Sequence, residues 1–548
     1  MVETKRAGAA LYRRRMGVLF AGILLIFLLL AVRLYYLQVM CGENLAAGAD
    51  AQQNMAVTGL DTRGLIYDRN MVPLVGGKNK YYYFIPASKE DSVSAQLLEA
   101  VSAADVTGAG SNVLYKVYRT DFYNSLVNRR LKSEYGAYVL MMESRYDENQ
   151  TACHLIGYIN QDEERGVSGL ELIYNDILYC EQDEYYLTVD GGGDILKGIA
   201  PVKSADGIFD TANSSSVVTT LDSRIQKQCE SILSEKELNG AVLVSNAETG
   251  EVLVWASSPA FNPEKLEEYI SSDDDCLVDK CIQGCYPPGS VFKIVVAAAA
   301  LEMGEIDPYE TFECSGTVTV NGIELGCTAG PEDGHGEVDM YEAMAVSCNC
   351  YFAKLGETIG TEAIVQMAEK MGLGQKVFED FPYESAGNVP AAEELGDWDV
   401  SNLSIGQGYL LATPAQIHRM VSIVACGGEL HPMYVADESG SSFQRIISEK
   451  TAAQLEQMLA EVMESGTGAA SASDEYNQTD EEILMYGKTG TAEASVNGNQ
   501  VNQCWFSGYL KNDGNTWMVT VLIENGVSGS YSALPVFEEI ADALVSIY

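Results

Sequence analysis

The sequence predicts an α+β protein with a membrane helix followed by two domains. Residues 16–32 form an uncharged run that follows a cluster of basic residues. Residues 42–222 mix short strand-like and helix-like stretches, whereas residues 223–548 have strand-like segments at both ends and helical runs between them. The second arrangement is typical of a single sheet with helices on its faces. A chain of 548 residues is also too long for one core.

The N-terminal run predicts a membrane anchor. Met16–Val32 is 17 residues long and lacks charge, which is close to the lower limit for crossing a bilayer. Arg33 and the tyrosines after it have the composition of a segment at the membrane–water interface. Because no clear small-x-small cleavage site follows, we expect an uncleaved anchor rather than a signal peptide. Because the basic cluster precedes the span, we expect a cytoplasmic tail over residues 1–15, an anchor over 16–36 and the remainder outside the cell.

The next segment, residues 42–222, is expected to act as a spacer. Tyr81–Pro86 has the composition of a strand. The segment shows no internal repeat and no recognisable glycosyltransferase motif, and it is short for an additional enzyme domain. We therefore predict an elongated mixed α/β pedestal.

Residues 223–548 are predicted to form an antiparallel sheet covered by helices. Gly240–Ser245 and Glu251–Ala256 have the pattern of a β-hairpin. Near the other end, Trp505–Tyr509 and Trp517–Ile523 read as two strands around a turn. A helical run lies at Leu455–Met463. We expect the first and last strands to share one sheet.

The composition restricts the class of function. The chain has 34 basic and 78 acidic residues and a net charge of −44. Nucleic acid is therefore not an expected partner, because binding to phosphates needs a basic face. The acidic excess favours solubility but identifies no partner.

Thirteen cysteines are unusual for a chain that is placed outside the cytoplasm. Cys314 and Cys327 flank the alternating segment Thr317–Val320 and could close a hairpin as a disulfide. Thiols left reduced in an anaerobic habitat would also explain the count. Three other cysteines lie just ahead of Ser290, but their spacings do not match a zinc pattern: Cys276, Cys281 and Cys285.

A candidate nucleophile lies in the stretch Tyr286–Lys293. A Pro-Pro-Gly turn ends at Ser290, and an apolar run follows to about Met303, so Ser290 is expected to be the first residue of a helix. Lys293 then lies on the same face and could take the hydroxyl proton if burial lowers its pKa. The helix N-terminus suits an oxyanion. The alternative is an ordinary helix cap beside a surface lysine.

Two later motifs favour catalysis. Ser347-Cys348-Asn349 and Lys488-Thr489-Gly490 follow the Ser290/Lys293 pair in the order found in penicillin-interacting serine acyltransferases. The chain resembles, from the anchor to about Asn525, the class B penicillin-binding proteins. Five further segments carry the resemblance: Asp61–Asn70, Gly166–Glu171, Gly334–Gly336, Gly406–Gly408 and Thr413–Gln416.

The resemblance implies a serine β-lactamase-like transpeptidase fold and a role for each catalytic residue. Ser290 would attack the carbonyl between two terminal D-alanines of a peptidoglycan stem peptide, and Lys293 would accept its proton. Ser347 would relay a proton to the leaving amine, and Asn349 would hold the substrate amide. Lys488 would supply positive charge. The product would be a cross-link between two stem peptides.

The resemblance also implies how the substrate is held. Thr489 and Thr491 would bind the substrate carboxylate, and Gly490 would let a substrate backbone lie close to the strand. The backbone N–H groups of Ser290 and Thr491 would form the oxyanion hole. Neither a metal nor an organic cofactor is expected. The implied partners are stem peptides, β-lactam inhibitors, the lipid bilayer and a multi-span glycosyltransferase. The implied location is the cell membrane, with a single span and an extracytoplasmic catalytic domain.

Other readings remain open at this point. A D,D-carboxypeptidase, a β-lactamase and a β-lactam sensor share the motif set, and a catalytically silent membrane scaffold is the non-enzyme alternative. A serine–histidine–aspartate triad is possible in principle. The four histidines, however, are expected to have structural or loop roles: His154, His335, His418 and His431. Cys348, at the variable position of the second motif, is not an expected nucleophile.

Overall fold

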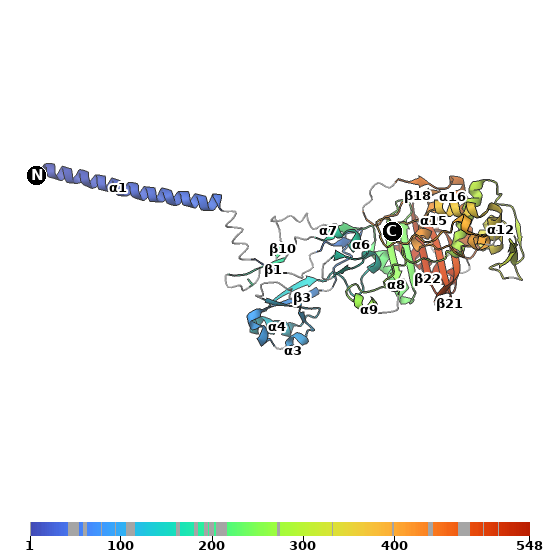
Figure 1. Ribbon diagram of the computed structural model, residues 1–548, viewed down its shortest axis with the longest axis horizontal. Coiled ribbons are helices and arrows are strands. Elements are labelled where there is room, and N and C mark those ends of the chain that lie inside the picture. Colours follow the sequence, from blue (N-terminus) through green and yellow to red (C-terminus); the bar gives the residue numbers. More distant parts are fainter. Residues whose placement is uncertain are drawn as a thin grey trace. The chain divides into compact units, whose positions relative to one another are not determined.

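The computed structural model shows two compact units whose segments alternate along the chain (Figure 1). The first unit comprises residues 1–62, 79–142 and 181–211, and the second comprises 63–78, 143–180 and 212–548. Residues 42–222, which the sequence predicts as one domain, are thus divided between the units. The structure describes residues 2–41, 54–57, 63–77, 79–93, 95–105, 115–160, 165–179, 185–190, 195–196, 202–203, 216–270, 275–330, 332–396, 399–436, 442–469, 483–496, 498–512 and 514–548.

The first unit begins with the helix α1 (Val2–Tyr35), which continues as a π-helical turn to Met40. Within it, Arg14–Met40 is 27 residues long and is apolar enough to cross a membrane. This stretch contains the predicted anchor at 16–36. At about 1.5 Å per residue it exceeds the thickness of a hydrocarbon core.

The rest of the first unit is a four-stranded sheet in the order β4-β5-β3-β6 and a three-stranded sheet in the order β1-β9-β10. The predicted strand Tyr81–Pro86 lies within β3. Successive residues of β3 point to opposite faces of the sheet and enter different cores. Phe84 packs in one core with Leu187, whereas Ile85 packs in the other with Leu131 of α4. The elements are β1 (Asn54–Val57), β3 (Asn79–Pro86), α3 (Ala95–Glu99), β4 (Ala104–Asp105), β5 (Tyr115–Thr120), α4 (Ser125–Glu134), β6 (Tyr138–Glu143), β9 (Tyr185–Thr188) and β10 (Val202–Lys203).

The second unit brings together two segments that the sequence places far apart. Glu171 is fully buried, and its carboxylate pairs with Arg63 at 2.5 Å and with Arg145 at 2.7 Å. The ion pair between Arg63 and Glu171 therefore joins the segments Asp61–Asn70 and Gly166–Glu171. Asp61 and Thr62 lie outside the described residues. The local elements are β2 (Ile66–Tyr67), α5 (Cys153–Ile156), β7 (Ile159–Asn160), β8 (Arg165–Gly166), α6 (Gly169–Ile173), α7 (Asn175–Leu178) and β11 (Val217–Val218).

A five-stranded antiparallel sheet in the order β13-β12-β22-β21-β20 forms the centre of the second unit. The first strands pair with the last ones, as expected, because Gly240 of β12 faces Ile523 of β22. The predicted hairpin and both C-terminal strands are confirmed. The strands are β12 (Gly240–Asn246), β13 (Val252–Ser258), β20 (Leu484–Val496), β21 (Asn499–Asn512) and β22 (Asn515–Glu524).

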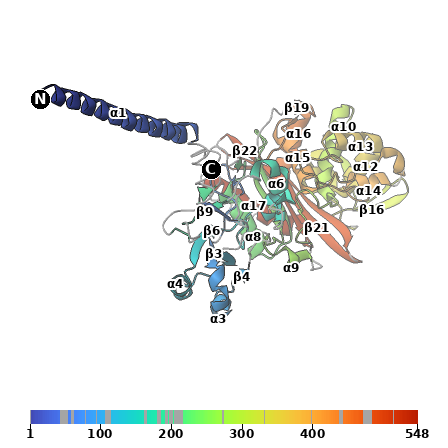
Figure 2. The ribbon, with the colours of Figure 1, turned by 60° about the vertical axis from the view of Figure 1, so that its left-hand side comes forward.

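Helices cover both faces of this sheet (Figures 1 and 2). Val242 and Val244 of β12 pack towards α8 (Ser223–Glu235) and α17 (Leu534–Ile547). The alternating Ala241 and Leu243 pack on the opposite side, with α15 (Pro414–Ala425) and α16 (Glu449–Glu464). Because both faces are buried, the three strands β12, β13 and β22 are apolar along most of their length.

A mostly helical region continues from the α15 side (Figure 2). It holds the small hairpin of β15 and β16, which confirms the predicted strand at Thr317–Val320. All cysteines in the described part of the chain are free, so the suggested disulfide between Cys314 and Cys327 is wrong. The remaining elements are α9 (Leu266–Ile270), α10 (Lys293–Met303), β14 (Phe312–Cys314), β15 (Thr317–Val320), β16 (Ile323–Gly326), β17 (Gly336–Val338), α11 (Met340–Ala345), α12 (Asn349–Ile359), α13 (Thr361–Lys370), α14 (Asp399–Ser404), β18 (Glu429–Leu430) and β19 (Gln444–Arg445).

Candidate active site

Ser290 lies in a tight turn directly ahead of α10. The turn is a 3-10 helix over Gly289–Phe292, and the α-helix begins at Lys293. The sequence predicts Ser290 as the first residue of the α-helix, but the structure places it in the 3-10 turn that precedes this helix. Gly289 has a φ of 55° and lies against Gly406 and Thr491, and the chain passes through one 3-10 turn before it reaches α-helical geometry.

Lys293 is fully buried and contacts the second motif. Its Nζ lies 2.7 Å from the backbone oxygen of Ser347, 3.2 Å from the Ser347 Oγ and 2.8 Å from the Asn349 Oδ1. Burial lowers the pKa of Lys293 to about 7, against an opposing effect of nearby thiols. A substantial fraction of the amine is therefore neutral at neutral pH and has a lone pair that can accept a proton.

The second motif occupies a strained turn between α11 and α12. Ser347 has a φ of 57°, which is uncommon for a residue with a side chain and costs on the order of 1–3 kcal/mol. The turn is held because the Cys348 N–H donates to the Ala343 carbonyl over 2.8 Å. The turn allows Ser347 and Asn349, which flank Cys348, to contact Lys293.

The third motif lies on β20, at the end of the strand order of the central sheet. This strand packs closely against the Ser290 turn. A Cβ on Gly490 would lie 2.9 Å from Val291 Cγ2 and 3.0 Å from the Pro288 oxygen, and a Cβ on Gly289 would lie 3.0 Å from the Thr491 oxygen. Two glycines thus permit the approach of the two backbone segments that carry the predicted oxyanion N–H groups.

The side chains of β20 have distinct surroundings. Lys488 is fully buried, and its pKa is lowered by burial and then by the charge of Lys293. A carboxylate that entered the site would favour the charged form of Lys488. The Thr489 Oγ1 lies 2.7 Å from the Thr467 Oγ1, and the Thr491 Oγ1 accepts the Gly529 N–H over 3.0 Å.

The predicted site residues gather around one cavity of about 640 Å³. Six of them line it: Ser290, Ser347, Asn349, Thr489, Gly490 and Thr491. Lys293 and Lys488 lie buried beside these residues rather than in the lining. None of the four histidines lines the cavity. His418, for example, is buried between Ser245 and Thr520 and has the structural role that we expect.

The cavity has further polar lining that sequence reasoning did not identify. Gln407 lines the cavity. It lies in the segment Gly406–Gly408, which carries part of the family resemblance but has no chemical role predicted from the sequence. The structure shows why Gly406 is needed: a Cβ there would lie 2.1 Å from the Gly289 oxygen, and the Gly406 oxygen accepts the Gly289 N–H over 2.9 Å. Other such residues are Thr328, Asn402, Thr467, Glu493, Asn502 and Ser530.

Comparisons with known proteins agree with this geometry. The family described as "Penicillin binding protein transpeptidase domain" matches residues 240–543, which is more than half of the chain. The chain is similar to "Stage V sporulation protein D" of Bacillus subtilis (strain 168), with 28% identity over 94% of this chain and 82% of that protein. It is also similar to "Peptidoglycan D,D-transpeptidase MrdA" of Escherichia coli (strain K12), with 27% identity over 77% and 74%.

Solved structures share the fold. The penicillin-binding protein PBP2 of Helicobacter pylori, in its complex with MreC, matches with a TM-score of 0.69 and 23% identity over 89% of this chain and 98% of that one. A chain from a structure titled "Structural coordination of polymerization and crosslinking by a peptidoglycan synthase complex" matches with a TM-score of 0.72 and 23% identity over 97% and 99%. The ordered motifs, the fold and the family match together show that this chain belongs to the penicillin-binding proteins, as a member of class B.

Proposed function

We propose that this protein is a serine D,D-transpeptidase that cross-links peptidoglycan stem peptides and is inhibited covalently by penicillin. The observation that carries this conclusion is the buried Lys293, whose Nζ contacts Ser347 and Asn349 beside the cavity that Ser290 lines. Two similar proteins carry a transpeptidase or sporulation name, which supports the same activity.

The proposed reaction has two acyl-transfer steps. The Ser290 Oγ attacks the carbonyl between two D-alanines, and neutral Lys293 accepts the hydroxyl proton. Ser347 passes a proton to the departing amine, so the C–N bond breaks and an ester on Ser290 remains. An acceptor amine then attacks this ester, releases Ser290 and forms the new amide. The backbone N–H groups of Ser290 and Thr491 stabilise the oxyanion in both steps.

Substrate binding is proposed for the strand β20. Thr489 and Thr491 hydrogen-bond the substrate carboxylate, and Lys488 gains charge as that carboxylate enters. Gly490 leaves room for a substrate backbone beside the strand, and Asn349 holds the substrate amide. The polar lining of the cavity supports this arrangement.

The cellular setting is also a proposal. The apolar helix Arg14–Met40 supports a membrane anchor. The basic cluster ahead of it supports a cytoplasmic N-terminus and an extracytoplasmic catalytic domain. Residues 42–222 are proposed to serve as a pedestal for partner proteins and 223–548 as the transpeptidase domain. A multi-span glycosyltransferase is the proposed source of the glycan strands.

Covalent labelling of the full chain in detergent with a reporter penicillin tests the activity. We expect a stable adduct on Ser290 by peptide mapping, no adduct in Ser290→Ala and a large loss in Lys293→Ala. Ser231→Ala is the control, because Ser231 is an exposed serine on α8. Rapid turnover of the drug would indicate a β-lactamase instead. Folded protein that gives neither adduct nor turnover would contradict the proposal.

A further inference from the structure

Glu493 carries the only charged side chain among the described residues that line the cavity at Ser290. The other lining side chains are neutral, and the two motif lysines, Lys293 and Lys488, lie buried beside them. Glu493 is exposed and belongs to β20, the strand that carries the third motif. A carboxylate at this place favours a cationic group on a ligand.

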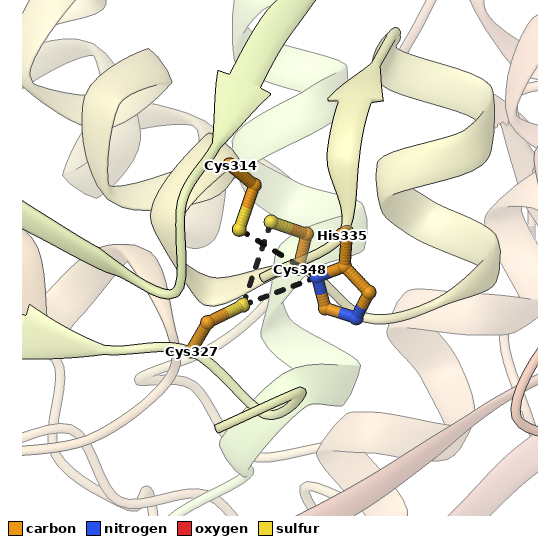
Figure 3. Close-up of side chains that lie close together, drawn as sticks. All are labelled: Cys314, Cys327, His335 and Cys348. Carbon is orange, nitrogen blue, oxygen red and sulfur yellow. Dashed lines mark hydrogen bonds between the residues drawn. The ribbon is translucent and has the colours of Figure 1, made fainter. Parts of the chain in front are cut away.

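The wall formed by the β15–β16 hairpin and the second motif adds no charged group to the lining. Leu325 lines the cavity from this hairpin. The side chains of Cys327 and Cys348 contact each other over 3.6 Å and form a separate group with Cys314 and His335 (Figure 3). None of these four side chains lines the cavity. The charge of the lining therefore comes from β20.

Glu493 is not neutralised by a basic side chain of the protein. Within the part of the chain that the structure describes, no ion pair involves its carboxylate. Its cross-strand neighbour, Asn502, is uncharged, and the Asn502 Nδ2 donates to the Val527 carbonyl over 3.1 Å. A free carboxylate is ordinary in a chain with 78 acidic residues, so its meaning depends on its place in the cavity.

Glu493 continues the row of side chains that is proposed to hold the substrate. Thr489, Thr491 and Glu493 are alternate residues of β20, so they lie on one face of the strand, and all three line the cavity. The pairing of β20 with β21 is regular from Thr489 to Glu493. At about 3.4 Å per residue, Glu493 lies roughly 7 Å beyond Thr491 along the strand.

The proposed reaction fixes the direction of the acyl donor along this row. In that reaction the scissile carbonyl lies at the Thr491 N–H, and the terminal carboxylate lies towards Thr489 and Lys488. The donor chain ahead of the two D-alanines therefore runs the other way, past Thr491 towards Glu493. Because one extended residue spans about 3.4 Å, the residue that precedes the two D-alanines comes within reach of the Glu493 side chain.

We propose that Glu493 binds a protonated amine on the side chain of the donor residue that precedes the two D-alanines. The substrate class is thus a stem peptide with a diamino acid at that position. The proposal rests on the proposed function, because the direction of the donor comes from the proposed acyl transfer. A reaction that joins two stem peptides through an amine also needs stem peptides that carry one. Glu493 determines specificity and takes no part in the transfer of the acyl group.

The size of this preference follows from the exposure of Glu493. An exposed ion pair changes an affinity by about fivefold or less. Dissolved ions screen such a pair, so the preference should shrink at high salt. The same carboxylate should disfavour a ligand that carries an acidic group at this position, because like charges repel.

Protection of Ser290 from a reporter penicillin tests the proposal in the full-length protein in detergent. One probe is Nα-acetyl-L-lysyl-D-alanyl-D-alanine, which keeps its side-chain amine, and the other is the same peptide with that amine acetylated. We expect the first peptide to protect at an about three- to fivefold lower concentration at low salt. The difference should shrink in about 0.5 M salt. Equal protection by the two peptides, or protection by neither, would overturn the proposal.

Variants test whether Glu493 is the source of the preference. Glu493→Gln should remove the difference between the two peptides, and Glu493→Lys should reverse it in favour of the acetylated peptide. Glu268→Gln is the matched control and should keep the preference, because it removes one exposed carboxylate outside the cavity. A preference that persists in Glu493→Gln, or that is lost in Glu268→Gln as well, would contradict the assignment to Glu493.

Penicillins with charged side chains give a second readout that does not depend on peptide binding. We compare the acylation rate of a penicillin whose side chain carries an amine with that of one whose side chain carries a carboxylate. Because intrinsic reactivities cancel between variants, the ratio of the two rates should fall about fivefold from the wild type to Glu493→Gln. An unchanged ratio would contradict the proposal. Folded protein that no penicillin labels would count against the proposed function itself.

Discussion

The Nζ of Lys293 donates a hydrogen bond to the Oδ1 of Asn349 over 2.8 Å, although 56 residues separate the two in the chain. This bond connects the helix that follows the candidate nucleophile with the turn that carries the second motif. Lys293 is completely buried, so every interaction of its amine is made with the protein. The protonation state of Lys293 is therefore set by this small group of neighbours and by the loss of solvent.

The first prediction concerns pH. Because burial lowers the pKa of Lys293 to about 7, the neutral base becomes more populated as the pH rises through 7. The rate of acylation by a reporter penicillin should rise about tenfold per pH unit below that value and level off above it. The buried groups that influence this amine are Lys488 and the thiols of Cys327, Cys348 and Cys350. A profile without a limb near pH 7, measured between about pH 5 and 9, would contradict this assignment.

The second prediction changes the charge beside the base. Asn349→Asp places a carboxylate next to the Lys293 amine and favours its protonated form. We expect the acid limb of the acylation profile to move up by about one pH unit or more. Asn349→Ala is the control: it should lower the rate through loss of the hydrogen bond but should not shift the limb upwards. A profile for Asn349→Asp that coincides with the wild type would show that the contact does not tune the base.

The third prediction concerns the close approach of β20 to the Ser290 turn. Gly490→Ala introduces a Cβ about 2.9 Å from Val291 Cγ2 and 3.0 Å from the Pro288 oxygen, so the strand and the turn must separate. Since the predicted oxyanion donors lie on these two segments, acylation should fall about tenfold or more, by the loss of aligned hydrogen bonds. Gly326→Ala, which meets nothing within 4 Å, should label normally. Equal labelling of both variants would refute the geometric argument.

The fourth prediction concerns stability. Glu171→Ala leaves Arg63 and Arg145 buried without their shared carboxylate, which should cost about 3–5 kcal/mol and lower the Tm by several degrees. Glu134→Ala is the matched control, because its pair with Arg130 is exposed. Exposed i,i+4 pairs contribute only about 0.3–0.5 kcal/mol. Similar melting curves for the two variants would mean that the buried pairs do not stabilise the unit.

Much of the fold can be predicted from the sequence because its signals are local. The apolar alternation of β12 and β22, the uncharged run after Arg15 and the turn before Ser290 each depend on neighbouring residues. The one-turn error at Ser290 has the opposite origin: a glycine with positive φ and a 3-10 turn are decided by close contacts with Gly406 and Thr491, which local patterns do not contain.

The sequence alone determined the ordered motifs and the sheet formed by both ends of the second domain, because residue type and periodicity carry that information. The tertiary structure alone decided which distant residues meet. Contacts such as Arg63 with Glu171, Lys293 with Asn349 and Cys327 with Cys348 depend on how helices and strands pack, and no local preference specifies them. The burial that lowers the pKa of Lys293 likewise exists only once these elements exclude water.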